Sequence, residues 1–437
     1  MPAAAAFEES PIRHPVEALD RELLQALQLE RLRATVALVL RAQPRGAELL
    51  AQAGITSADE IHSLDDLARI PFMRKADLRE NYPFGLLAVP RTDLVRVHAS
   101  SGTHGKPTVV GYTRNDLENW TELMARCMTM GGVKPGMLVH NANGYGLFTG
   151  GLGFHQGAER LGATVVPVSG GFTARQAMLL ADLGAEVLIS TTSYALAIAA
   201  AVRDAGQDPL TLGLEIGLFG GEASTPRMRE EIERQLGLRA INSYGLSEMC
   251  GPGVSAECMF ARNGLHVNED HFLVEVIDPE DGRVLEPGEE GELVFTTLTK
   301  EAMPLIRYRS GDLARIGVEA CSCGRTTARI FDLRGRHDDM LTIRGVNVHP
   351  SNVEHLLLGV PGITPYYRLV VERAGLMDEL TVECEIEGDV DPIELSARTA
   401  TMLREQMGLR ITITILEPGS LPRSDGKAVR VIDRRGD

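Results

Sequence analysis

Residues 97–108, Val-His-Ala-Ser-Ser-Gly-Thr-His-Gly-Lys-Pro-Thr, combine hydroxyl side chains, two glycines and a lysine behind a strand-like run. Glycines let backbone N–H groups approach phosphate oxygens, and the hydroxyls and the lysine add donors and a positive charge. The segment is not a Walker A loop, because Ser100 stands where that motif needs glycine and Pro107 where it needs serine or threonine. The pattern indicates a polyphosphate cradle, with an ordinary turn as the alternative.

Four further segments carry residue types that suit nucleotide chemistry. They are Tyr-Gly-Leu-Ser-Glu at 244–248, Tyr-Arg-Ser-Gly-Asp at 308–312, Gly-Arg-His-Asp-Asp at 335–339 and Gly-Lys at 426–427. In order and spacing the set resembles the AMP-forming acyl-CoA synthetase superfamily, and particularly its phenylacetate–CoA ligase branch. Additional matches lie at 144–153, 251–254, 298–304 and 344–348, so the resemblance covers most of the chain from about residue 60.

The resemblance implies a two-step reaction that uses ATP, Mg²⁺ and CoA. A carboxylate attacks the α-phosphate of ATP and gives acyl-AMP and pyrophosphate, and a thiol then attacks the activated carbonyl and expels AMP. The first step needs charge neutralisation on a polyphosphate, which donors, a cation and a metal supply. The implied partners are a small aromatic carboxylic acid and CoA, or a carrier protein in place of CoA.

The resemblance also assigns the ATP site. Ser101, Thr103 and Lys106 are expected to hold the β and γ phosphates, with Lys106 counted among the catalytic residues. Glu248 is expected to bind Mg²⁺, a hard ion that prefers carboxylate oxygens, although a solvated loop acid is the alternative. Tyr244 is expected to stack on adenine, or to be a core tyrosine that closes a strand. The remaining expected ATP-binding residues are Ser100, Gly102, Gly105, Gly221, Glu222, Gly245 and Ser247.

Three later residues complete the expected nucleotide site, and a fourth marks a hinge. The carboxylate of Asp312 is suited to accept from the ribose hydroxyls, unless it is a plain turn residue. Arg336 is expected to reach the ribose or the α-phosphate. By resemblance, Asp338 is the hinge of a mobile small domain, and Lys427 enters the active site only in the adenylating conformation. A surface lysine is the alternative for Lys427.

The acid pocket is expected around residues 141–153, 220–222 and 251–253. Its predicted members are Asn143, Tyr145, Phe148, Gly220, Gly251 and Pro252, in which glycines leave room for a flat ring and aromatic side chains give apolar walls. The chain departs from the phenylacetate branch at Asn143, His104 and Ala223-Ser224, where that branch has Tyr, Thr and Pro-Trp. An amide in a ring pocket needs a polar partner, so we expect an amino- or hydroxy-substituted ring, unless Asn143 bonds the backbone instead.

Three cysteines and a histidine form a possible metal site. Cys258 and His266 lie eight residues apart, and Cys321 and Cys323 form a Cys-x-Cys pair further on. Three thiolates and an imidazole are a usual ligand set for a closed, structural zinc site. Some ligases similar to this chain carry such a cluster, whereas small buried cysteines are the alternative.

Composition excludes some classes of protein and sets the scale. The chain has 437 residues, 44% of them hydrophobic, and a formal net charge of -16. The length favours more than one domain, and the acidic balance argues against nucleic acid as a partner. No apolar run reaches the ~20 residues that span a bilayer. Six cysteines in a chain of this length do not suggest a secreted disulfide framework, and the first residues lack the features of a signal peptide. We therefore expect a cytoplasmic protein. A homodimer is one option for its assembly.

The periodicity of the sequence predicts an α/β fold. Apolar residues at helical spacing over 16–43 predict an amphipathic N-terminal helix or helix pair. From residue 93, short apolar runs, the first a strand at 94–98, alternate with helical ones such as 173–183, 193–205 and 225–236, which predicts a large N-terminal domain with mostly parallel sheets. Alternating runs at 272–277 and 292–298 predict a β-rich subdomain with antiparallel strands. The last hundred residues predict a small, mobile α+β domain. We therefore expect an adenylation core at 1–335 and a C-terminal domain that carries the catalytic lysine at 336–437.

Together these expectations indicate an AMP-forming aryl-acid–CoA ligase, an acid–thiol ligase. A stand-alone adenylating enzyme that passes the acyl group to a carrier protein or an amine is the alternative within the same chemistry. An inactive nucleotide-binding sensor is the alternative from another class, against which the intact Lys427, Glu248 and Asp312 argue.

Overall fold

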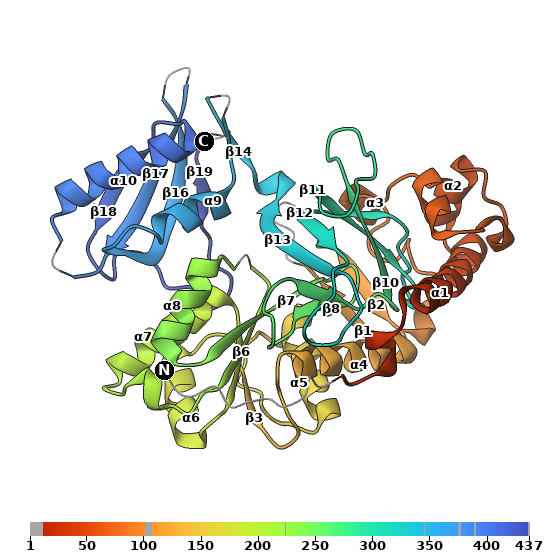
Figure 1. Cartoon of the computed structure of the whole chain (residues 1–437), viewed down its shortest axis with the longest axis horizontal. Helices are drawn as coiled ribbons and strands as arrows, with labels where there is room; N and C mark the ends of the chain where they lie inside the picture. Colours follow the sequence, from red (N-terminus) through yellow and green to blue (C-terminus); the bar gives the residue numbers. More distant parts are fainter. Residues whose placement is uncertain are drawn as a thin grey trace.

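The structure is a computed structural model that describes residues 12–100, 107–222, 224–344, 346–374, 377–388 and 390–435. A large N-terminal part is joined to a smaller C-terminal part, which lies at the upper left in Figure 1. The α-helices are α1 (Arg21–Ala42), α2 (Pro44–Gln52), α3 (Lys75–Glu80), α4 (Arg114–Met130), α5 (Thr149–Leu161), α6 (Thr173–Leu183), α7 (Thr192–Asp204), α8 (Pro226–Leu236), α9 (Pro350–Leu357) and α10 (Pro392–Met407). Short 3-10 helices are η1 (Pro15–Ala18), η2 (Ala58–Glu60), η3 (Leu64–Arg69), η4 (Arg91–Asp93), η5 (Pro209–Thr211) and η6 (His337–Asp339).

One continuous sheet runs through the large part. Its strands are β3 (Leu138–Asn141), β4 (Thr164–Val166), β5 (Val187–Ser190), β6 (Ile216–Phe219), β7 (Arg239–Leu246), β8 (Gly251–Glu257), β9 (Leu265–Val267), β10 (Phe272–Ile277), β11 (Glu290–Thr297), β12 (Tyr308–Gly317) and β13 (Arg329–Arg336). They lie in the order β10-β11-β12-β13-β9-β8-β7-β6-β5-β3-β4. Pairing is parallel from β4 to β7 and antiparallel from β7 to β10, so the predicted parallel and β-rich portions are two halves of one sheet.

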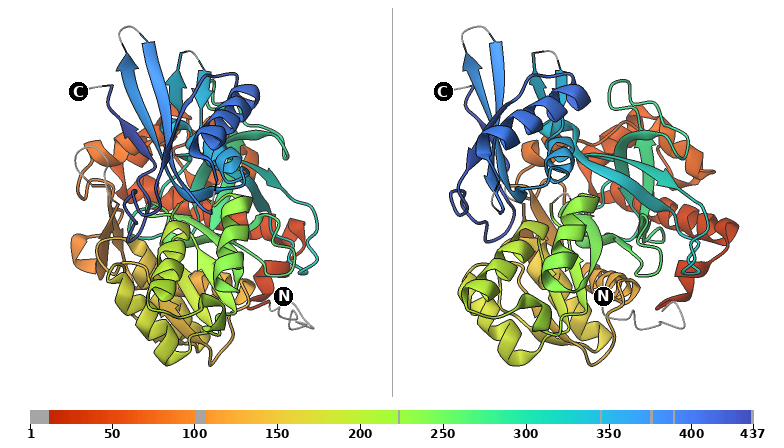
Figure 2. Two further views of the ribbon diagram at one scale, coloured as in Figure 1. Left: turned by 90° about the vertical axis from the view of Figure 1, so that its left-hand side faces the viewer. Right: turned by 60° about the vertical axis from the view of Figure 1, so that its left-hand side comes forward.

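Helices cover both faces of the parallel half. Along β5 the side chains of Val187 and Ile189 join the core under α4 and α5, while Leu188 joins the core under α6, α7 and α8. Successive side chains of a strand point to opposite faces, so an uninterrupted apolar strand is buried on both sides. The run of apolar residues that suggested a covered parallel strand is thus explained by the two helical layers, which Figure 2 shows on either side of the sheet.

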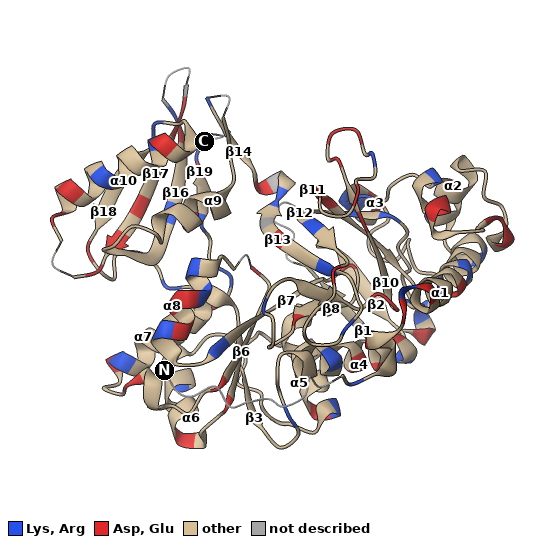
Figure 3. Cartoon of the chain, in the orientation of Figure 1, with Lys and Arg blue, Asp and Glu red and all other residues tan. Residues whose placement is uncertain are grey.

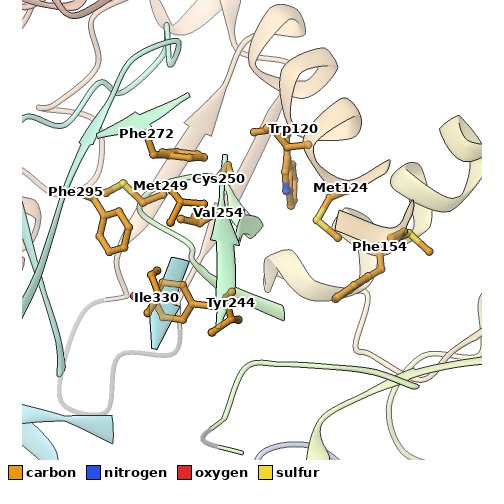
Figure 4. Packing of buried hydrophobic residues seen from close by; sticks show 14 of the residues in the cluster. Trp120, Met124, Phe154, Tyr244, Met249, Cys250, Val254, Phe272, Phe295 and Ile330 are labelled. Carbon is orange, nitrogen blue, oxygen red and sulfur yellow. The ribbon is translucent and has the colours of Figure 1, made fainter. Parts of the chain in front are cut away.

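The aromatic residue Trp120 anchors α4 against the antiparallel half. Trp120 is 1% exposed, and its indole N–H donates to the Pro252 carbonyl at 2.7 Å. Figure 4 shows Trp120 opposite a cluster that includes Phe272, Phe295 and Tyr244. This core lies directly behind the turn between β7 and β8.

The strand expected at 94–98 does not belong to the large sheet. It forms β1 (Arg96–Ala99), which pairs antiparallel with β2 (Val109–Tyr112) as a two-stranded sheet. The expected phosphate loop therefore connects the two strands of a hairpin. Helix α1 confirms the expected N-terminal helix, whereas α4 and α5 were not expected.

The C-terminal part has a separate core. Its strands are β14 (Leu341–Ile343), β15 (Val346–Val348), β16 (Ile363–Ala374), β17 (Met377–Ile386), β18 (Thr412–Leu416) and β19 (Val431–Asp433), of which four form the sheet β18-β17-β16-β19. Helices α9 and α10 pack on this sheet through side chains such as Val353, Leu357 and Leu403. The large sheet and this smaller one confirm the predicted α/β fold class, with a separate α+β unit at the C-terminal end.

Charged side chains of both signs alternate along α1 and α8, as Figure 3 shows. Among the described residues, no helix is both long and apolar enough to cross a membrane.

Candidate active site

Most predicted site residues lie where the parallel strands end. The loops that follow β3, β5 and β6, and the turn after β7, meet at the same edge of the sheet, because parallel strands present their carboxyl ends together. This edge carries Asn143, Gly221, Glu222 and Glu248. The C-terminal part covers the edge with the loop that carries Lys427, which lies against Gly221.

Tyr244, Asp312 and Arg336 come together from three strands. The Tyr244 hydroxyl donates to Oδ2 of Asp312 at 2.6 Å, and Arg336 lies opposite Asp312 in the β12–β13 register. The Tyr244 ring stacks on Phe295 with 6.0 Å between centroids, and burial together with the neighbouring Asp312 carboxylate raises the pKa of Tyr244. Tyr244 is thus a buried tyrosine that holds the carboxylate expected to bind ribose.

Glu248 lies in the turn between β7 and β8 and is 8% exposed. The Tyr308 hydroxyl is 3.4 Å from its Oε1. The adjacent Met249 carbonyl accepts from the ammonium group of Lys300 at 2.6 Å, and that group also lies 4.5 Å from the centre of the Tyr112 ring. Burial lowers the pKa of Lys300, while nearby acids including Glu248 oppose the shift. The turn therefore presents a carboxylate whose position is fixed by its neighbours.

The loop that carries Lys427 contacts Gly221 and Glu222 across the boundary between the two parts. Gly221 has a φ of 84°, and a Cβ built on it would lie 3.3 Å from Cε of Lys427, so the lysine packs against the bare backbone. Both oxygens of Glu222 accept hydrogen bonds: Oε1 from the Thr192 hydroxyl at 2.8 Å and the Ser193 N–H at 2.5 Å, and Oε2 from the Ala428 N–H at 3.1 Å.

The loop between β3 and α5 carries the predicted acid-pocket residues Asn143, Tyr145 and Phe148. Asn143 donates its backbone N–H to Asn141, and its side chain lies beside Gly150. Phe148 is 52% exposed. Tyr145, which lies between them in the sequence, is half-buried. Its hydroxyl oxygen accepts from the side-chain amide of Asn141 at 2.7 Å. Burial raises the pKa of Tyr145 to about 12.

The predicted glycines and proline of the acid pocket serve close packing. A Cβ on Gly251 would lie 2.5 Å from the Thr149 side chain and 2.8 Å from Trp120, and one on Gly220 would lie 2.4 Å from the Ser243 carbonyl. Pro252 lies opposite Gly245 in the β7–β8 register. The space without a side chain at Gly251 is therefore filled by Thr149 and Trp120.

The expected phosphate loop is described only at its ends. The Ser100 N–H donates to the Thr108 carbonyl at 2.9 Å, which closes the hairpin. The predicted residues Ser101, Gly102, Thr103, Gly105 and Lys106, and also His104, lie outside the described residues. Ser247 lies in the β7–β8 turn, and Asp338 lies in η6, directly after the last strand of the large sheet.

The three cysteines and the histidine predicted as a metal site converge on one point. Their ligand atoms all lie within 4.8 Å of one another, with 3.7 Å between the sulfurs of Cys258 and Cys321 and 3.4 Å between Sγ of Cys323 and Nε2 of His266. Tetrahedral zinc with ordinary bond lengths separates sulfur ligands by about 3.8 Å. The other ring nitrogen of His266 contacts the Thr327 hydroxyl at 3.1 Å, which orients the imidazole.

Tyr308, Lys300 and Thr191 are site residues that the sequence reasoning did not single out for a role. Tyr308 and Lys300 stood inside matched segments, so their position was visible, but the contacts with the Glu248 turn depend on strands that the chain brings together only in three dimensions. Thr191 follows β5 outside any matched segment, and its hydroxyl donates to the Gly426 carbonyl at 2.8 Å.

Comparisons with known proteins match most of the chain. A family model described as AMP-binding enzyme matches residues 15–298, and one described as AMP-binding enzyme C-terminal domain matches residues 345–435. A phenylacetate-coenzyme A ligase of Thermus thermophilus is 50% identical over 96% of this chain and 98% of its own length. One of Escherichia coli is 45% identical over 96% of this chain and 97% of its own length.

The arrangement of the N-terminal and C-terminal parts can be compared with two solved states of one similar enzyme. A 2-hydroxyisobutyryl-CoA ligase in the postadenylation state, 30% identical and covering 97% of this chain and 92% of its own, matches with a TM-score of 0.91. The same enzyme with CoA in the thioesterification state matches with a TM-score of only 0.72. The two parts of the present chain are therefore arranged as in the postadenylation state.

These matches confirm the predicted enzyme class, an AMP-forming acid–thiol ligase that uses ATP and CoA. The chain belongs to the AMP-binding enzyme family.

Proposed function

We propose that the protein joins an aryl acid of the phenylacetate class to CoA through an acyl-AMP intermediate. One observation carries the proposal: Lys427 lies over the same sheet edge at which Tyr244, Asp312 and Glu248 are assembled. The names of the relatives and their identity over nearly the whole chain supply the substrate class.

In the first step, a carboxylate oxygen of the acid forms a bond to the α-phosphorus of ATP, and the bond from that phosphorus to the pyrophosphate oxygen breaks. Lys427 supplies a positive charge beside the reacting oxygens, and Asp312 accepts from the ribose hydroxyls. In the second step the thiol of CoA loses its proton and its sulfur bonds to the acyl carbon, and AMP leaves with the electron pair of the broken mixed-anhydride bond.

Glu248 is the residue that would hold Mg²⁺. Its carboxylate is fixed by the Tyr308 hydroxyl and by a turn whose Met249 carbonyl is bonded to Lys300, so the ligand oxygen is held in place before the ion arrives. When bound, Mg²⁺ neutralises charge on the phosphates.

The ring substituents of the acid are a further part of the proposal. Asn143 lies beside Gly150 at the start of α5, where the phenylacetate branch has a tyrosine, and its amide suits a ring that bears an amino or hydroxyl group. We expect such acids to be preferred over unsubstituted benzoate, and we expect Asn143→Tyr to shift the preference toward phenylacetate.

The test is ATP–pyrophosphate exchange across phenylacetate, benzoate and their amino and hydroxy derivatives, followed by detection of the CoA ester. The proposal expects exchange and a CoA ester with at least one of these acids. Absence of exchange with every aryl acid contradicts the substrate class, whereas exchange without a CoA ester identifies a carrier protein or an amine as the acceptor.

A structural zinc ion is proposed for the site of Cys258, His266, Cys321 and Cys323. The separations of the ligand atoms support it, because they match the spacing of ligands around tetrahedral zinc. Such an ion would link the end of β8, β9 and the loop between β12 and β13. Elemental analysis should find about one zinc per chain, lost in Cys321→Ser together with a lowered Tm. A protein with full Tm and no zinc contradicts the proposal.

A further inference from the structure

The loop that carries Lys427 is seated on the large part by a short series of hydrogen bonds. The Thr173 hydroxyl donates to Oδ1 of Asp425 at 3.1 Å, the Thr191 hydroxyl donates to the Gly426 carbonyl at 2.8 Å, and the Ala428 N–H donates to Glu222 at 3.1 Å. These contacts hold the residues on both sides of Lys427. They place the lysine without using its own ammonium group.

Glu222 has a special place in this series because it joins two elements of the large part to the loop. Its Oε1 accepts from the Thr192 hydroxyl and the Ser193 N–H, at the start of α7, and its Oε2 remains for Ala428. A carboxylate carries only acceptors, so all three donors can be satisfied at once. An amide in its place would turn one donor toward another donor.

The same helix start also supplies Thr191, the N-cap residue of α7. Its hydroxyl oxygen accepts from the Tyr194 N–H at 3.3 Å, while the hydroxyl donates to the Gly426 carbonyl. The N-cap of α8 repeats this arrangement, because Thr225 accepts from the Met228 N–H and donates to Glu354 of the small domain. Each contact exists only while the small domain lies against these helix ends.

The comparison of the two states of the 2-hydroxyisobutyryl-CoA ligase makes this dependence chemically specific. The present arrangement matches the postadenylation state and differs from the thioesterification state. The contact between Glu222 and Ala428 thus belongs to the arrangement that resembles the postadenylation structure.

We propose that Glu222 is a positioning residue for the adenylation step alone, which seats the Lys427 loop through the Ala428 N–H and has no part in thioester formation. The inference rests on the proposed function, because it takes Lys427 to act on the acyl-AMP-forming step. It differs from a role of Glu222 in holding ATP, because the carboxylate accepts from the loop and from α7.

The experiment measures the two half-reactions separately in the full-length protein. Pyrophosphate exchange reports adenylation, and CoA-ester formation from added acyl-AMP reports the second step. For Glu222→Gln we expect the kcat of exchange to fall about tenfold, with the KM for ATP and the second step unchanged. Thr191→Val should act in the same direction, and Thr191→Ser should restore the rate.

Glu186→Gln is the matched control. Glu186 is a partly buried carboxylate of the large part that accepts from the Leu138 N–H at 2.7 Å. Among the described residues, it makes no hydrogen bond to the C-terminal part. It should leave both half-reactions unchanged.

Four results would overturn the inference. A raised KM for ATP with normal kcat shows that Glu222 holds ATP, and an equal loss in both half-reactions shows a general structural role. If exchange is normal in Glu222→Gln but strongly reduced in Lys427→Ala, Glu222 does not position the Lys427 loop, and the proposed function stands. Normal exchange in Lys427→Ala contradicts the role of the lysine in adenylation, and with it the positioning role of Glu222.

Discussion

At the scale of single residues, the site depends on carboxylates held by hydroxyl groups. Asp312 is bound by Tyr244, and Glu248 by Tyr308, with both tyrosines buried. A buried tyrosine keeps its proton because burial raises its pKa, so it remains a donor at neutral pH. The hydroxyl groups therefore orient the two carboxylates before the nucleotide binds.

Tyr244→Phe tests this arrangement. Removing the hydroxyl deletes the 2.6 Å hydrogen bond to Asp312, and a hydrogen bond to a charged group is worth about 1.5–3 kcal/mol. We expect the KM for ATP in pyrophosphate exchange to rise about tenfold with a smaller change in kcat. A lowered Tm with an unchanged KM would show that Tyr244 is only a core residue.

At the scale of elements, buried ion pairs fix how the helices lie on the sheet. Arg126 of α4 contacts both oxygens of Asp270 at 3.1 Å, and the two side chains are 4% and 5% exposed. Arg31 of α1 reaches the same carboxylate at 3.5 Å. Asp270 lies two residues before the start of β10, so this single carboxylate joins two helices to the antiparallel half of the sheet.

Arg126→Met should lower the free energy of unfolding by about 2–4 kcal/mol at neutral pH, because it leaves a buried carboxylate with fewer partners. Burial opposes ionisation of Asp270, but His271 and Arg126 outweigh it and lower its pKa. A lowered pKa contributes stability above the ordinary value of 3.8 that is lost as the pH falls through the lowered value. Urea denaturation should therefore show a smaller difference between variant and wild type in acid than at neutral pH, and an equal difference at both would contradict the account.

At the scale of the whole molecule, the small domain is held against α8 by a buried acid. Glu354 is 6% exposed and accepts from Thr225 of the large part at 3.1 Å and from Tyr367 at 2.8 Å. Burial raises its pKa, while Arg430 opposes the shift and Glu222 adds to it. The docked arrangement therefore favours the protonated form of this acid.

The expected consequence is a dependence of stability on pH. A carboxyl with a raised pKa contributes most below its ordinary value of 4.5, and that contribution is lost as the pH rises through the raised value. Glu354→Gln keeps a neutral side chain at every pH, so its unfolding free energy should fall less than that of the wild type over this interval. Parallel pH profiles for the two proteins would show that Glu354 does not titrate at the boundary.

The sequence by itself determined the enzyme class and the α/β fold, and it named the candidate residues of the site. Motifs around Glu248, Asp312 and Lys427 are local, and local spacing survives in the linear chain. Alternating apolar runs likewise revealed most strands of the sheet, because burial on one or two faces imposes a period on the sequence. Helices α4 and α5 were not predicted. Helix α5 begins with glycines, which are poor helix formers but are required where its backbone approaches Gly144 and Trp120.

Only the tertiary structure decided which groups act on one another. The pairing of Tyr244 with Asp312, the close approach of Cys258 to Cys321, and the contact of Glu222 with Ala428 join residues 63 to 206 positions apart. Such contacts form because strands and loops distant in the chain come together in the fold, and no local pattern encodes the partner of a side chain. The seat of Lys427 is for this reason a property of the folded molecule and of one arrangement of its two parts.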